Sequence, residues 1–417
     1  MITWSVNLNP NRLDPELRPD ALEAATPQAL EHLETLGARG VRVDLFWHWL
    51  MPTPWGVNEA ALAWYRDFFA QLKARGLTPF VLLYHPPEWA MALLDTDEAL
   101  FLEAWARFCR LVRALELPLV QIWNEPNNFL AGLKGDAALF DVRRVGKLAL
   151  PTGVRWHTLA AMFAIARAEL PESRLVYNVL ANLSPFLPAK RTWLDWEHFT
   201  QLLLERAGEA VDVIALDHYP DTWAPGAGPL EWECLDIARR HVNTPGSVWH
   251  GKAIMIGEVG YSSAPNFHLV EWPLKWGRFF PGERDEVSMA DWYGAALCHL
   301  QTALTRARFP HNTAHWINLY ELFDAPHPVG AHAALRVEEH FGLVRRDGTP
   351  KLAYHVVREA MHGTLAYDLA TVGAPRVPLP WRLARWAEQW RERGQKPAVQ
   401  VLERTVPAAL APLEAER

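Results

Sequence analysis

The segment LPLVQIWNEPN, residues 117–127, is the most informative part of this 417-residue chain. Its first six residues are mainly apolar and predict a buried strand, and the polar residues that follow place Glu125 at the C-terminal end of that strand. A second apolar run, Ala253–Ile256, ends in the same way with Glu258. Two strands that each end in a glutamate indicate two carboxylates facing each other across a pocket, as general acid/base and nucleophilic chemistry requires.

Short β-branched runs alternate with amphipathic helical stretches about eight times along the chain. Several of the runs are apolar on both faces, which is typical of a parallel sheet covered by helices. The pattern predicts an α/β fold, a (β/α)8 TIM barrel, in which catalytic residues lie at the C-terminal ends of the strands. A doubly wound sheet is the main alternative, but no Gly-rich phosphate-binding turn follows the first strand. The strands are expected at Ile2–Asn7, Val41–Phe46, Thr78–Tyr84, Leu117–Trp123, Arg174–Val179, Val211–Tyr219, Ala253–Glu258 and Ala314–Tyr320.

Helix starts are readable between the strands. Thr26-Pro27 predicts the first, with proline in its first turn. Asn58 and the pair Asp95 and Asp97 are placed to cap the next ones, and Ser288–Asp291 resembles a capping box. The corresponding helices are expected at Glu59–Ala74, Leu100–Leu115 and Trp292–Arg306, with a last one at Lys351–His362.

Residues 1–366 are expected to form one catalytic barrel, and residues 367–417 a short C-terminal extension packed on it, not an independent domain. Long loops are expected at the C-terminal face of the barrel, on the side of the two glutamates, and loops of this length are usually functional or disordered. They are Asn127–Thr152, Ser184–Thr192 and Ser262–Val287.

Composition excludes several partners. A net charge of −7 offers no basic surface for nucleic acid. The chain has no apolar run of membrane-spanning length and no leader-like start, so we expect a cytoplasmic protein. Three cysteines, far apart and odd in number, predict buried free thiols and no disulfide or metal site. Composition does not predict the oligomeric state.

The ends of the fourth and seventh strands resemble those of a known enzyme family. Trp123-Asn124-Glu125-Pro126-Asn127 on the fourth strand and Glu258 on the seventh resemble the strand ends of glycoside hydrolase clan A, over roughly residues 1–365. The motif Trp-Asn-Glu-Pro is specific when it ends a strand. The resemblance implies a retaining hydrolase of β-glycosidic bonds in a glycoside, oligosaccharide or polysaccharide. Glu125 would be the acid/base and Glu258 the nucleophile, with no cofactor and no metal.

The resemblance also implies roles for five further residues. Asn124 would bind the sugar's 2-hydroxyl, Arg42 would support the charge of the nucleophile, and Tyr219 would donate a hydrogen bond to it. His85 matches a histidine at the end of the third strand, and Trp316 matches the tryptophan that floors the sugar-binding subsite.

One departure concerns the sixth strand, which reads Asp217-His218-Tyr219 where the cellulase-like families of the clan carry His-x-Tyr. His218 remains a candidate substrate ligand, although strand alternation points it away from Tyr219. Core packing is as good an interpretation of Trp316 as a sugar platform, and Arg42 is also placed for a structural ion pair with Asp44.

Two other functions compete. A metal-dependent hydrolase on the same barrel would need ligand spacings such as His-x-His or His-x-x-x-His, which the seventeen histidines do not form. A non-catalytic carbohydrate-binding barrel would not need both glutamates. The sequence predicts neither the sugar nor whether action is exo or endo.

Overall fold

The computed structural model describes residues 2–127, 156–181, 196–220, 222, 228–264, 284–306, 316–325 and 333–372. Eight parallel strands close into a barrel in which each strand pairs with its neighbours in the sequence, and β8 pairs with β1. This confirms the predicted (β/α)8 fold. The strands are β1 (Thr3–Asn7), β2 (Gly40–Phe46), β3 (Thr78–Tyr84), β4 (Leu119–Ile122), β5 (Arg174–Leu180), β6 (Val213–Asp217), β7 (Ala253–Val259) and β8 (Trp316–Leu319).

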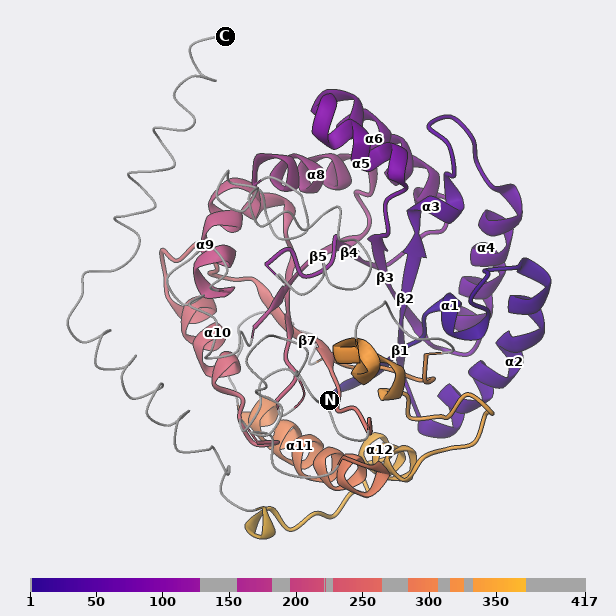
Figure 1. The fold of residues 1–417 in the computed structure, drawn as a ribbon. Helices are drawn as coiled ribbons and strands as arrows, with labels where there is room; N and C mark the ends of the chain where they lie inside the picture. The colour runs from indigo at the N-terminus through magenta and orange to yellow at the C-terminus, as the bar shows by residue number, and fades with distance from the viewer. Residues whose placement is uncertain are drawn as a thin grey trace.

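Helices form a ring around the barrel (Figure 1). The described α-helices are α1 (Pro10–Leu13), α2 (Pro19–Leu36), α3 (Trp47–Leu50), α4 (Glu59–Ala74), α5 (Glu88–Thr96), α6 (Glu98–Arg113), α8 (Trp156–Glu169), α9 (Trp196–Ala207), α10 (Glu233–Asn243), α11 (Glu286–Arg306) and α12 (Leu352–Met361). Short 3₁₀ segments follow α9 at Gly208–Ala210, β8 at Ala333–His340 and α12 at Leu369–Thr371. None of the helices in the described ranges combines the length and apolar character needed to cross a bilayer.

Two of the predicted caps are confirmed and two are corrected. Asn58 accepts a hydrogen bond from the Ala61 amide at the start of α4, and Asp97 caps α6. The first long helix, however, begins at Pro19, so Pro27 lies inside it and the Thr26 hydroxyl donates to the Leu22 carbonyl. At α11 the capping pair is Asp285 with Ser288, which exchange hydrogen bonds, so the helix begins at Glu286, nearly two turns before the predicted start at Trp292.

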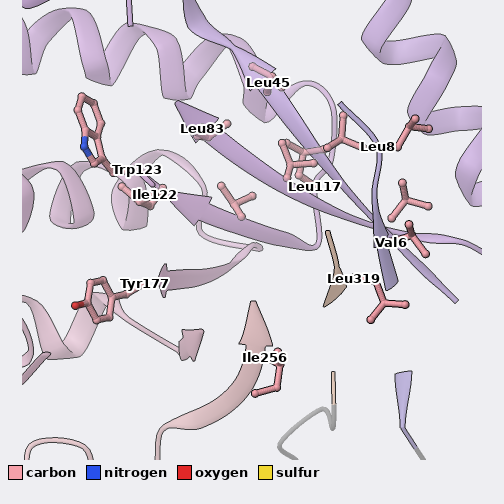
Figure 2. Packing of buried hydrophobic residues seen from close by; sticks show 14 of the residues in the cluster. Val6, Leu8, Leu45, Leu83, Leu117, Ile122, Trp123, Tyr177, Ile256 and Leu319 are labelled. Atoms are coloured by element: carbon pink, nitrogen blue, oxygen red, sulfur yellow. The ribbon is translucent and has the colours of Figure 1, made fainter. Parts of the chain in front are cut away.

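The main core lies between the outer faces of the strands and the helices. Figure 2 shows members of this cluster from seven of the strands. They are Val6, Leu45, Leu83, Ile122, Tyr177, Ile256 and Leu319, each at most 1% exposed. Of the cysteines, Cys109 and Cys234 are buried and free as predicted, whereas Cys298 is partly exposed and free.

The inside of the barrel changes from apolar to polar along the strands. Inward side chains within the first three residues of β3 to β8 form an apolar layer, which consists of Phe80, Leu119, Val176, Val213, Ala215, Ala253, Met255 and Trp316. Gly40 is needed here, because a Cβ atom on it would lie 2.4 Å from the Trp316 ring. Further along the strands the inward positions are polar and buried, and they include Asn7, Arg42, Gln121, Asn178 and Asp217. The polar and charged side chains inside the barrel therefore lie toward its C-terminal end.

Most of the three long connections and nearly all of the C-terminal extension lie outside the described residues. The extents of those loops and the division at residue 366 stay predictions.

Candidate active site

Three carboxylates meet at the C-terminal end of the barrel. One oxygen from each of Glu125, Asp217 and Glu258 lies within 4.8 Å of one from the others. Their residues are 5%, 0% and 6% exposed, so water screens their charges poorly. The two glutamates expected to face each other are therefore brought together, and a third acid lies with them.

The backbone that carries Glu125 has an unusual conformation. Trp123 and Glu125 have φ angles of 65° and 37°, in the left-handed region that side chains disfavour. Amide side chains hold this turn: Gln121 donates to the Trp123 carbonyl at 3.0 Å, and Asn178 accepts from the Glu125 amide at 2.9 Å. Asn127 then binds the backbone of Leu180 on β5 in both directions, at 3.0 and 2.9 Å.

Glu258 is held by two donors. An Arg42 Nη1–Oε1 distance of 2.7 Å defines an ion pair, and the Tyr219 hydroxyl donates to the other oxygen, Oε2. Arg42 is 1% exposed, so its guanidinium acts on Glu258 in a poorly solvated environment. Burial raises the pKa of Tyr219 well above its usual range, and the charges of Glu258 and Glu125 add to it, so the hydroxyl stays a donor.

The Asn124 side chain has a fixed orientation. Its Oδ1 atom accepts hydrogen bonds from Arg42 Nη2 at 3.1 Å, from Gln121 Nε2 at 3.2 Å and from Asn178 Nδ2 at 3.2 Å. Because three donors converge on this atom, it must be the amide oxygen and not the nitrogen. The Asn124 Nδ2 group is thus turned away from this network and is left to donate elsewhere.

His85 lies beside this centre and not within it. Its Nε2 atom is 3.0 Å from Asp44 Oδ2, and the other oxygen of Asp44 lies 3.8 Å from Arg42. Burial works against ionisation of Asp44, yet the His85 hydrogen bond and Arg42 prevail and lower its pKa. Arg42 therefore serves both the ion pair with Asp44 considered from the sequence and the contact with Glu258.

Asp217 behaves differently from Asp44. Burial raises its pKa well above the usual range, and the negative charges of Glu258 and Glu125 raise it further, against the weaker opposing effect of Arg42. From the sequence, Asp217 was noted only as a departure from the His-x-Tyr pattern, and Gln121 and Asn178 were missed as parts of the site. The available signal was an amide side chain at an inward position of an otherwise apolar strand.

Two candidate residues are placed away from the carboxylates. His218 turns to the other side of β6, where its Nε2 atom lies 2.6 Å from the Glu231 carbonyl and its ring packs on Trp232. The assignment of Trp316 to the floor of the sugar site is wrong, because it is the first residue of β8 and belongs to the apolar layer at the opposite end of the barrel.

The end of β8 instead carries Tyr320 and Glu321. The Tyr320 ring lies edge-on to Tyr219, with centroids 6.2 Å apart, so it borders the support of Glu258. Glu321 is fully buried and accepts from Arg12 Nε at 3.0 and 2.8 Å. The predicted strand ended at Tyr320, but the sequence did not indicate that this residue borders the site.

Carboxylate oxygens are also the ligands that hard divalent cations take. Here both oxygens of Glu258 already accept from Arg42 and Tyr219, and the guanidinium charge opposes a second cation beside it. Among the described residues the arrangement suits a charged nucleophile better than a metal centre.

Comparisons with known proteins agree with this geometry. No protein-family profile matches the chain. A curated 6-phospho-beta-galactosidase of Streptococcus mutans is 32% identical over 151 residues, a match that covers 33% of this chain and only 28% of that relative. The solved structure of beta-glycosidase BGL167 superposes with a TM-score of 0.59 at 15% identity, covering 88% of this chain and 97% of that one. A family 1 b-glucosidase from Thermotoga maritima gives 0.55 at 14%, covering 88% and 98%. This chain has the β-glycosidase barrel fold. At these identities the likeness to the solved structures establishes the fold alone, and it agrees with the resemblance to glycoside hydrolase clan A.

Proposed function

We propose that the chain is a retaining β-glycoside hydrolase, with Glu125 as acid/base and Glu258 as nucleophile. The observation that carries this proposal is the separation of the carboxylates, which have oxygens within 4.8 Å of each other. Retaining glycosidases place the two groups about 5–5.5 Å apart, whereas inverting ones need about 6.5–9.5 Å to admit a water.

In the first step Glu258 attacks the anomeric carbon while Glu125 gives its proton to the glycosidic oxygen. The bond from the anomeric carbon to that oxygen breaks, the leaving group departs as an alcohol, and a glycosyl ester forms on Glu258. Before the attack Arg42 and Tyr219 hold Glu258 by opposite oxygens, which fixes the direction of the carboxylate.

In the second step a water gives its proton to Glu125 and its oxygen to the anomeric carbon, which releases the Glu258 carboxylate. The same Arg42 and Tyr219 donors receive the returning charge. The outward Nδ2 group of Asn124 would donate to the sugar's 2-hydroxyl oxygen, and that contact strengthens as charge develops on the ring.

The substrate is a β-linked carbohydrate. The name of the Streptococcus mutans relative specifies a 6-phospho-β-galactoside, so a screen of aryl β-glycosides should include each sugar with and without a 6-phosphate. β-Linked oligosaccharides in the same screen distinguish exo from endo action.

The test of the mechanism is covalent trapping. A 2-fluoro β-glycoside of the correct sugar should label the peptide that contains Glu258, as read by mass spectrometry, and Glu258→Gln should take no label. Proton NMR should show the β configuration in the first-formed product. A label on Asp217 or Glu321, or an inverted product, would overturn the assignment.

A further inference from the structure

Asp217 forms no direct ion pair with any of the described residues, although Arg42 is near enough to oppose the rise of its pKa. Asp217 stands opposite Glu258 in the pairing of β6 with β7 and is fully buried. Its Oδ2 atom accepts from Asn178 Nδ2 at 2.6 Å. Its Oδ1 atom lies against Gly257, where a Cβ atom would come within 2.4 Å, and has no hydrogen-bond partner among the described residues.

The charged groups around Asp217 come from several strands. Glu125 faces it from the end of β4 and Glu258 from β7, while β5 offers only the neutral amide of Asn178. On β6 itself the Tyr219 hydroxyl is directed at Glu258.

The positive charge near this group is already engaged by other acids. Arg42, on β2, lies 2.7 Å from Glu258 and 3.8 Å from Asp44. His85, after β3, pairs with Asp44. One guanidinium thus faces several buried acids, and ionising all of them would leave uncompensated charge in a poorly solvated space.

We propose that Asp217 is a positioning residue that keeps a proton through the whole reaction, so that the protonation of Glu125 responds to Glu258 alone. This inference rests on the proposed function. Burial, which raises the pKa of Asp217, supports it, and so does the negative charge that stands on Glu258 before the attack and on Glu125 after it.

The chemical reason lies in the two roles of Glu125, which must be protonated in the first step and ionised in the second. The change is driven by Glu258, which is an anion before the attack and a neutral ester after it. A permanently ionised Asp217 about 5 Å away would favour protonated Glu125 in both steps, by roughly two to three pH units at an effective dielectric constant of about 20. A neutral Asp217 removes that obstacle.

The neutral acid also has a structural task. As an acceptor for Asn178 Nδ2, it leaves Asn178 Oδ1 free to bind the Glu125 amide. The same Nδ2 group reaches Asn124 Oδ1 at 3.2 Å. Asp217 thereby orients the residues on either side of the acid/base position without touching substrate.

Infrared difference spectroscopy at pH 7 tests the proton directly. Asp217→Asn should lose one carbonyl-stretch band of a protonated carboxylic acid. The matched control is Asp44→Asn. Asp44 is another buried aspartate, on β2, and this variant should lose only a carboxylate band. Wild-type protein labelled with ¹³C-aspartate gives a second measurement that needs no variant: one carboxyl resonance should stay at the protonated position from pH 5 to 8. Loss of a carboxylate band in Asp217→Asn, or the absence of any aspartate resonance that stays at the protonated position, would overturn the proposal.

The pH dependence of kcat/KM supplies the functional readout. Both limbs of the profile should stay within about 0.3 pH unit in Asp217→Asn, even if turnover falls several-fold. Movement of both limbs to lower pH by a unit or more would mean that Asp217 is ionised in the wild type. That result would overturn this inference and would leave the proposed glycosidase function unaffected. Failure of the trapping experiment would overturn the proposed function but would not change the spectroscopic evidence on the proton of Asp217.

Discussion

The ion pair between Arg42 and Glu258 should be the strongest side-chain coupling in the site. The perturbation is a double-mutant cycle of Arg42→Met, Glu258→Gln and the double variant, followed by urea unfolding at pH 7 with tryptophan fluorescence. Arg42 and Glu258 are 1% and 6% exposed. For charge centres about 4 Å apart at an effective dielectric constant of about 20, Coulomb's law gives about 4 kcal/mol.

Arg42→Met alone should therefore lower the free energy of unfolding by about 3–5 kcal/mol, because it leaves a buried acid without its counter-charge. The double variant should recover much of this loss, with a coupling energy of about 3 kcal/mol. Arg110 and Glu169 form a matched control with the same 2.7 Å separation, but Arg110's side chain is 48% exposed. That pair should couple by less than about 1 kcal/mol. Additivity at Arg42 and Glu258 within about 0.5 kcal/mol would refute the reasoning.

Three further predictions follow from the same geometry. Tyr219→Phe removes one hydrogen bond to the Glu258 carboxylate and should lower kcat/KM about 10- to 100-fold, since such bonds contribute about 1.5–3 kcal/mol; an unchanged kcat/KM would count against the contact. Glu125→Ala should keep most of kcat/KM on aryl glycosides with good leaving groups, which need no proton, while kcat falls because the second step loses its base. Azide should restore turnover as a β-glycosyl azide; equal damage on all substrates without rescue would contradict the role of Glu125 as acid/base. Burial raises the pKa of Glu321 to about 7 against the opposing effect of Arg12, so the folded state holds this proton more tightly than the unfolded state. The contribution of Glu321 to the free energy of unfolding should therefore fall by about 3 kcal/mol as pH rises from about 4.5 to 7. Glu321→Gln should lack this contribution, and parallel curves of unfolding free energy against pH for the two proteins would contradict the prediction.

The positions of Glu125 and Glu258 could be predicted because the signal is local. Each follows an apolar run, and in a barrel of parallel strands all C-terminal ends share one face. The resemblance to clan A, and not the local pattern, placed Arg42 and Tyr219 near Glu258, where the structure has them in contact.

Other features depend on where a strand begins and which way a residue faces. Trp316 was matched to a sugar-site tryptophan by the resemblance to clan A, with core packing as an equally good interpretation, and the structure places it in the apolar layer at the start of β8. The meeting of Asn178 with Asp217 could not be predicted, since nothing local says that two polar groups on neighbouring strands meet inside a barrel. Thr26-Pro27 looks like a helix start, but a buried face beginning with Leu22 extends that helix back to Pro19.

The left-handed turn at Trp123 and Glu125 has a consequence for directed evolution. Each such residue costs roughly 1–2 kcal/mol, and the surrounding amides hold it in place. Selection for heat resistance alone would favour substitutions that relax this turn, since many routes to higher stability pass through strained active sites. Each relaxation would move the carboxyl group of Glu125 off its target. A library screened only for survival at high temperature should therefore accumulate inactive barrels with changes at residues 121–127, while one screened for turnover as well should leave this segment untouched and gain its stability elsewhere.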